Sequence, residues 1–204
     1  MEATSLVCPS CGGSVELANR FVKMVVCGYC GNTLAVENDR LDPTGKAAAL
    51  VDYPTRFRIG QTGKLRSSPF RILGRVRLED EDGYWDEWYL QFDDGSIAWL
   101  EEEEGEYTLS RKTPLTSAVP DFDAARVGAT ITVNNQRFFI TEKCRARISG
   151  AEGQLYYKIR INQPVRFLDG NLGGRLGSVE YGESEIEYTT GEVIAREEVL
   201  LNEA

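Results

Sequence analysis

The sequence predicts an all-β protein, in which a small N-terminal ribbon built around four cysteines precedes a duplicated body of antiparallel β-meanders. Three observations support this class. Two Cys-x-x-Cys pairs lie near the N-terminus, the chain after Phe57 consists of short alternating segments separated by Gly, Asp and Asn, and part of that body repeats at an offset of 68 residues. We expect each copy to form a small barrel- or sandwich-like unit.

The four cysteines predict a metal site over residues 1–38. They are Cys8, Cys11, Cys27 and Cys30, and fifteen residues separate the two pairs. A tight turn presents two sulfurs to one ion, and a second such turn completes the tetrahedron that zinc prefers. Four thiolates leave no coordination position for water, so the pattern indicates a zinc ribbon with four cysteine ligands, in which Zn2+ is structural.

Three alternatives to zinc are iron in a rubredoxin-like site, two disulfides and a redox dithiol. Rubredoxin-like domains carry a longer insert between the pairs, and disulfides need an oxidising compartment. Residues 1–5 lack the basic and apolar regions of a signal peptide, and no apolar run reaches transmembrane length. We therefore expect a cytoplasmic protein with reduced thiols that is not embedded in a membrane.

The composition and the absence of certain motifs exclude several classes of function. The chain of 204 residues has a formal net charge of -9, which argues against sequence-independent nucleic-acid binding because that binding depends on Lys and Arg. It contains no histidine, no Gly-x-Ser-x-Gly elbow and no Walker A pattern, which excludes the usual hydrolase triads and nucleotide-binding loops. Neighbouring acids such as Asp86 and Glu87 point to opposite faces of a strand, so paired-carboxylate catalysis is not supported either.

After the ribbon, turn formers and a brief alanine run predict a linker over residues 39–55, with room for one helical turn. The first β unit is expected over 56–119 and the second over 120–204. Placing Gly60 on Gly128 sets Phe70 on Phe138 and supports the duplication. The same alignment sets Cys144 on Val76, which favours a small buried thiol over a nucleophile.

All three tryptophans, Trp85, Trp88 and Trp99, lie within fifteen residues. Their clustering favours a small β core, and the alternative is an exposed aromatic binding face.

Charge is segregated in the first unit. Residues 53–78 carry bases and no acid, whereas residues 79–106 carry thirteen acids and no base, including the run Glu101, Glu102, Glu103 and Glu104. The simpler explanation is cross-strand pairing of Arg75 and Arg77 with Asp86 and Glu87, together with solvated turns. The sharper hypothesis is an interaction face, formed by the acidic run and the three tryptophans, for a basic protein segment or a polyamine.

Several segments resemble a known bacterial family, the domain of unknown function 4178, over roughly residues 56 to 195. They are Phe70–Val76, Trp85–Leu90, Asp94-Gly95, Trp99-Leu100, Gly105–Tyr107, Gly150–Leu155 and Val179–Tyr181. Several members likewise begin with a ribbon of this Cys-x-x-Cys kind. The resemblance implies a non-enzymatic accessory protein, often encoded beside polyamine-type aminopropyltransferases and membrane-stress proteins, and supplies no catalytic residues. The chain departs from the family pattern at Val165–Asp169.

These observations together predict a non-enzymatic, zinc-binding adaptor that mediates protein–protein interactions, in a membrane-stress or polyamine-linked system. The partner is expected to be a protein, a basic one if the acidic face is functional, with a polyamine as a further candidate. The alternative is a nucleic-acid-binding zinc-ribbon protein that uses the ribbon or the stretch from Arg56 to Arg77.

Overall fold

The computed structural model describes residues 4–46, 50, 51, 53–182 and 185–203. The N-terminal ribbon contains a hairpin of β1 (Thr4–Val7) and β2 (Ser14–Leu17), and a sheet of β3 (Met24–Val26), β4 (Asn32–Glu37) and β5 (Arg40–Lys46). The predicted linker over 39–55 is therefore wrong for residues 40–46, which form a strand of the ribbon. The helical turn expected at the alanine run falls on residues 47–49, which lie outside the described residues.

The described residues of the body form eleven strands, in two sets that share one pattern. The first set is β6 (Thr62–Leu65), β7 (Ser68–Glu79), β8 (Tyr84–Phe92), β9 (Ile97–Glu103) and β10 (Glu106–Lys112). The second is β11 (Thr130–Val133), β12 (Gln136–Leu155), β13 (Pro164–Asn171), β14 (Leu176–Tyr181) and β15 (Ile186–Ile194), and β16 (Val199–Leu201) pairs back onto β6. The offset of 68 residues places β6 on β11 and the start of β7 on the start of β12, which agrees with the predicted duplication.

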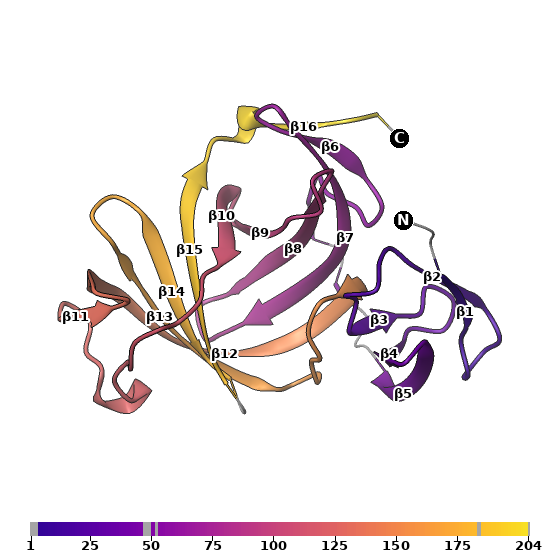
Figure 1. Ribbon diagram of the computed structural model, residues 1–204, viewed down its shortest axis with the longest axis horizontal. Coiled ribbons are helices and arrows are strands. Elements are labelled where there is room, and N and C mark those ends of the chain that lie inside the picture. The colour runs from indigo at the N-terminus through magenta and orange to yellow at the C-terminus, as the bar shows by residue number, and fades with distance from the viewer. Residues whose placement is uncertain (1–3, 47–49, 52, 183–184, 204) are drawn as a thin grey trace.

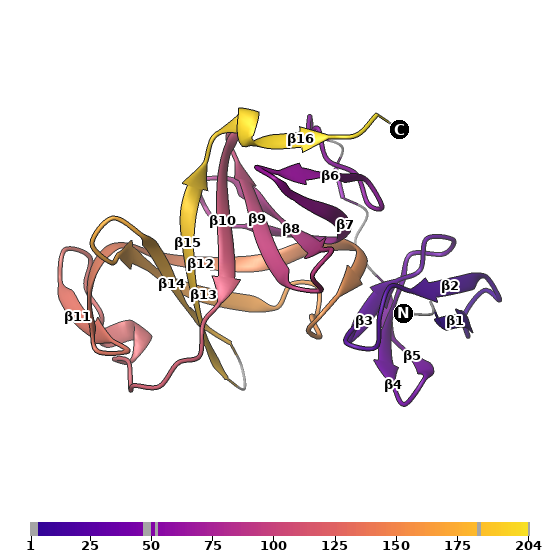
Figure 2. The same ribbon diagram turned by 45° about the horizontal axis from the view of Figure 1, so that its top comes forward.

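Eight of these strands form a closed antiparallel ring, in the order β7-β8-β9-β10-β15-β14-β13-β12 and back to β7. Figures 1 and 2 show the ring as a barrel beside the ribbon. Equivalent strands of the two units meet at both junctions, β10 with β15 and β7 with β12, so the barrel has an approximate two-fold arrangement. The all-β fold class is confirmed, and the finding beyond it is that the two units enclose one barrel together.

Each unit packs a hydrophobic core against the outer face of its own strands. In the first, Trp88 and Leu100 lie beneath Val199 of β16 and are almost fully buried. In the second, Phe138 and Val179 pack with Phe122 of the short 3-10 helix η1 (Phe122–Ala124). Because side chains alternate along a strand, these outer cores leave the intervening residues to face the interior of the ring.

A buried ion-pair cluster joins β7 to β8 on the outer face. Arg77 and Asp86 are 1% and 3% exposed, and nitrogens of Arg75 and Arg77 lie 2.7 and 2.8 Å from Oδ2 of Asp86. The predicted cross-strand pairing is thus confirmed for Asp86. It is wrong for Glu87, whose side chain faces the interior of the ring and forms no ion pair within the described residues.

The seam between β7 and β12 depends on two facing glycines, Gly74 and Gly153. A Cβ at Gly74 would lie 2.2 Å from the carbonyl oxygen of Gln154, and Gly153 has φ +70°, where a side chain is strained. This close approach lets β12 continue beyond the ring, where Gln154 and Leu155 pair with β3 of the ribbon.

Helical structure in the described part of the chain is limited to η1 and a second 3-10 turn, η2 (Arg196–Glu198). Within those residues, no helix has the length and apolar character needed to span a membrane.

Candidate functional site

The four N-terminal cysteines come together in two equivalent turns. Cys8 N–H donates to Gly13 O and Cys27 N–H to Asn32 O, at 2.8 and 2.9 Å, and all four sulfurs lie within 4.8 Å of one another. Sulfur–sulfur distances are 3.9 Å for Cys8 and Cys30 and 3.7 Å for Cys11 and Cys27. Tetrahedral coordination with metal–sulfur bonds of about 2.3 Å places sulfurs roughly 3.8 Å apart, so the geometry fits a metal ion.

The ribbon's own hydrophobic core is small. Among the described residues it contains eight buried side chains, two of which are the cysteines Cys8 and Cys27. Small segments of this kind rely on a metal or disulfides for stability, and none of the four cysteines forms a disulfide. The cluster can therefore hold a metal ion that fixes the β1–β2 hairpin against the β3–β5 sheet.

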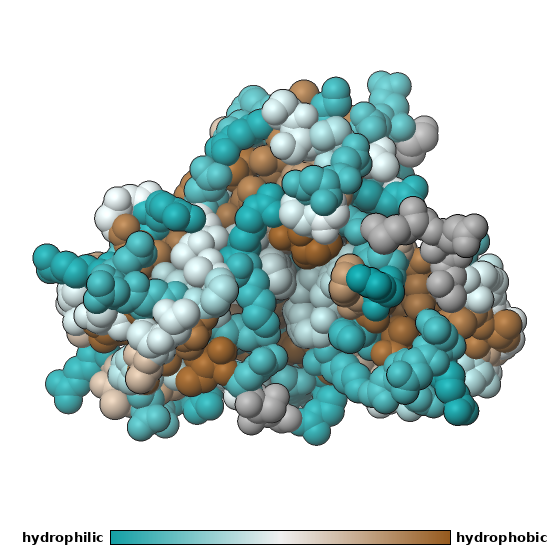
Figure 3. Space-filling model, viewed as in Figure 1, coloured by the Kyte–Doolittle hydropathy of each residue, from teal (hydrophilic) through white to brown (hydrophobic). Residues whose placement is uncertain are grey.

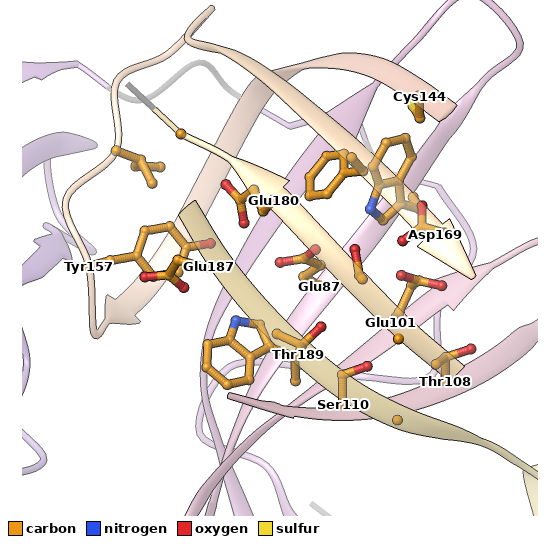
Figure 4. Close-up of a pocket in the computed structure, with 18 of the residues that line it drawn as sticks. Glu87, Glu101, Thr108, Ser110, Cys144, Tyr157, Asp169, Glu180, Glu187 and Thr189 are labelled. Atoms are coloured by element: carbon orange, nitrogen blue, oxygen red, sulfur yellow. The ribbon is translucent and has the colours of Figure 1, made fainter. Parts of the chain in front are cut away.

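The second candidate site is a cavity of about 670 Å³ inside the barrel. Inward-facing residues of β8, β9, β10, β13, β14 and β15 form most of its wall, as Figure 4 shows. Eight-stranded barrels are just wide enough to hold one small ligand, and 670 Å³ lies within the usual range for ligand pockets. The ring closure is thus what creates this space.

Carboxylates dominate the cavity wall. Among the described residues, the nine acidic ones are Asp80, Glu87, Glu101, Glu103, Glu142, Asp169, Glu180, Glu185 and Glu187, and the two basic ones are Lys158 and Arg160. Lys158 forms an ion pair with Glu37 of the ribbon. The cavity wall therefore carries a large excess of acidic over basic groups.

Eight of these nine acids form no ion pair within the described residues, and the ninth, Glu187, pairs with Lys112. Burial, and then the charge of neighbouring carboxylates, raises the pKa of Glu101 and of Glu180 to about 7 and that of Asp169 to about 6. Burial also raises the pKa of Glu87 well above its ordinary value, followed by repulsion from Glu180 and Glu101. The site thus holds protons that a cation could displace.

Aromatic rings form the other part of the wall. Trp85, Trp99, Tyr157 and Phe167 line the cavity, and the rings of Trp85 and Phe167 meet edge to face with centroids 6.0 Å apart. Behind Trp99 and Tyr157 lies Tyr89, which is fully buried and whose hydroxyl has no hydrogen-bond partner in the described structure. Rings beside carboxylates can bind a cation through their faces and its methylene groups through apolar contact.

The seven residues expected from the sequence to form one interaction face lie in three different places. Trp85, Trp99, Glu101 and Glu103 line the cavity. Trp88 and Glu102 lie on the opposite face of the sheet, where Trp88 Nε1 donates to Glu102 Oε2 at 3.0 Å, and Glu104 is exposed in the turn after β9. The small-core interpretation of the tryptophans therefore applies to Trp88, and the seven residues do not form one surface.

Other cavity residues were missed because they come from distant segments. Asp169, Glu180 and Glu187 stand on β13, β14 and β15, at positions that alternate with buried apolar residues. A single acid on the face of a strand opposite its buried apolar residues is the signal that could have identified them. Cys144 also reaches the cavity, is 8% exposed and has its pKa raised to about 12 by burial, as expected for a buried thiol.

A comparison with protein families supports the resemblance seen in the sequence. The model of the family described as "Domain of unknown function (DUF4178)" matches residues 58–196, a range that contains the eight strands of the barrel, with the ribbon outside it. No curated protein matches the chain, and no solved structure does. With more than half of its length matched, the chain belongs to the DUF4178 family.

Proposed function

We propose that this protein is a non-enzymatic binding protein whose barrel cavity binds a linear organic polycation, an oligoamine, and whose four cysteines hold a structural zinc ion. The observation that carries the proposal is the cavity inside the barrel, whose wall carries nine carboxyl groups among the described residues. Unpaired carboxylates that repel one another are costly for the ligand-free protein. A bound cation relieves that cost, so the cavity should bind a cation much more tightly than a neutral molecule of the same size.

The arrangement of the acids favours a chain of charges over a single ion. Among the described residues, the cysteine cluster is the one group whose ligand atoms are close enough together to hold a metal. The cavity carboxylates instead stand on several strands around the wall. An oligoamine places its ammonium groups several bonds apart, so it can reach separated carboxylates while its methylene segments lie against Trp85 and Trp99.

We assign the cavity no reaction. Its one thiol, Cys144, is kept neutral by burial and lies 3.5 Å from Asp80 Oδ2, so it is a poor nucleophile. The carboxyl groups that retain protons near neutral pH are suited to exchanging a proton for a cationic ligand. That exchange accompanies binding and needs no catalytic step.

A protein-docking role for the ribbon is a second candidate. Val7, Phe21 and Tyr29 are 68%, 54% and 74% exposed, and Figure 3 shows hydrophobic side chains at the surface of the ribbon. Exposed apolar side chains of this size are suited to contact with a protein partner. Crosslinking in cell extract, comparing the wild type with a Val7→Ser/Tyr29→Ser variant, tests this role; equal crosslinked products from both would contradict it.

Nucleic-acid binding has less support. Arg75 and Arg77 are buried against Asp86, and Arg66 pairs with Glu192 and Glu198, so three bases of the basic stretch already have acidic partners. Binding to nucleic acid would require free cationic groups facing the phosphates.

The test is isothermal titration calorimetry of the metal-loaded protein with spermine at pH 8 and low salt. Binding should weaken at least tenfold in Glu87→Gln/Glu101→Gln, and should change little in Glu197→Gln, which removes an exposed charge outside the cavity. A lysine-rich peptide and Mg2+ are titrated in parallel. Tighter binding of either than of spermine, or equal spermine affinity in the cavity variant, contradicts the proposal.

A further inference from the structure

We propose that the metal-loaded ribbon forms part of the cavity wall and positions its aromatic lining, so that metal binding at the four cysteines and ligand binding in the barrel strengthen each other. The ligand part of this inference rests on the function proposed above. The structural part concerns how residues 14–46 contact the barrel.

The ribbon and the barrel share one continuous sheet. Val25 and Met24 of β3 pair with Gln154 and Leu155 at the end of β12, and Lys23 N–H donates to Leu155 O at 2.9 Å. The side chain of Gln154 also accepts from Ala18 N–H at 2.8 Å and donates to the carbonyl oxygen of Glu16 at 3.0 Å. These bonds fix the ribbon loop against the end of the longest barrel strand.

Two ribbon side chains line the cavity directly. Met24 of β3 is 1% exposed and packs in the core cluster at the β7–β12 seam, and Thr44 of β5 borders the same space. The family match begins at residue 58, so this part of the wall lies outside the matched region. Without a folded ribbon, the cavity would lose this part of its wall.

A chain of contacts runs from the ribbon to the tryptophan in the cavity. Asn19 lies between the two cysteine pairs, is 7% exposed, and its Nδ2 donates to the hydroxyl of Tyr156 at 2.5 Å. The ring of Tyr156 stacks on Tyr89 with centroids 5.7 Å apart, and Tyr89 meets Trp99 at 5.1 Å. Tyr157, the next residue, lines the cavity. Asn19 therefore positions the segment that carries this aromatic wall.

The metal controls whether these contacts exist. Asn19 lies in the loop that joins β2 to β3, and the four cysteines fix those strands to each other through the ion. Because the ribbon core is so small, loss of the metal is expected to unfold the loop and release Tyr156 and Met24. Linkage then requires that a bound ligand raise the affinity for the metal by the same factor.

The experiment compares metal-loaded with chelator-treated full-length protein, and wild type with Asn19→Ala, which keeps all four cysteines. Arg20→Ala, a change at the next residue, is the matched control. Tryptophan emission reports on the barrel alone, because all three tryptophans lie between residues 85 and 99. We expect a red-shifted emission and at least fivefold weaker spermine binding on metal removal, a smaller change of the same sign in Asn19→Ala, and none in Arg20→Ala.

The possible failures are distinguishable. If emission and amide exchange of residues 154–159 do not change on metal removal, the coupling is refuted, whether or not spermine binds. If the emission shifts but metal-loaded protein binds no spermine, the positioning of the aromatic wall by the ribbon is supported and the proposed ligand is wrong. If Asn19→Ala retains its metal and has wild-type emission and affinity, the contact chain through Tyr156 is refuted.

Discussion

Replacing Glu101 by glutamine should stabilise the ligand-free protein and weaken its binding of cations. The pKa of Glu101 is raised to about 7 by burial and by neighbouring acids, against about 4.3 for glutamate in an unfolded chain. Each pKa unit is worth about 1.4 kcal/mol, so keeping this side chain ionised at pH 8 costs on the order of 3 kcal/mol. Glutamine removes the charge with little change in shape, and we expect a gain of roughly 1 to 3 kcal/mol.

The raised pKa of Glu101 makes the free energy of unfolding depend on pH. As pH rises from about 4 to 7, the unfolded chain loses the Glu101 proton first, so the wild type loses stability over this range. The gain in Glu101→Gln should therefore be small near pH 4 and complete above pH 7. Urea unfolding at both pH values measures it, and Glu197→Gln, an exposed charge, should differ from wild type by less than about 0.5 kcal/mol. A Glu101→Gln protein that is less stable than wild type at pH 8 would refute the reasoning.

Three further predictions concern the buried ion-pair cluster, the β7–β12 seam and the ribbon. Asp86→Ala leaves two buried guanidinium groups without their carboxylate and should cost roughly 3 to 5 kcal/mol in urea unfolding, whereas exposed Asp93→Ala should cost little; equal effects would contradict the role of the cluster. Gly74→Ala should lower the melting temperature through the clash with Gln154 O, and a thermal scan equal to that of exposed Gly83→Ala would contradict the seam geometry. Chelation should raise amide exchange throughout residues 4–46 while the outer cores stay protected, and uniform exchange in the whole chain would contradict a separately stabilised ribbon.

Local sequence patterns predicted what depends on local geometry. The spacing of the cysteines predicted their cluster, because two tight turns are enough to bring four sulfurs together. Alternation predicted the antiparallel strands, and the repeat predicted two units with the same first two strands. The missed strand β5 contains Pro43 and Gly45, residues that are rare in strands and tolerated here because β5 is at the edge of its sheet.

The cavity could not be predicted in this way, because it depends on pairing between distant segments. Ring closure needs β10 to pair with β15, which joins Tyr107 to Ile194. Without knowledge of that pairing, nothing in the sequence indicates that the acids of β9 and those of β14 lie in the same site. Glu87 was assigned to the arginines through its neighbour Asp86, although strand alternation places the two on opposite faces of β8.

The most direct test of the central claim counts the protons that leave the protein when spermine binds. Calorimetry at pH 6.5, in two buffers with different ionisation enthalpies, gives this number. Because a bound cation favours the ionised form of Glu87, Glu101, Asp169 and Glu180, the account predicts a net release of protons that shrinks in Glu87→Gln/Glu101→Gln. Binding with no proton release, or the absence of binding, would contradict it.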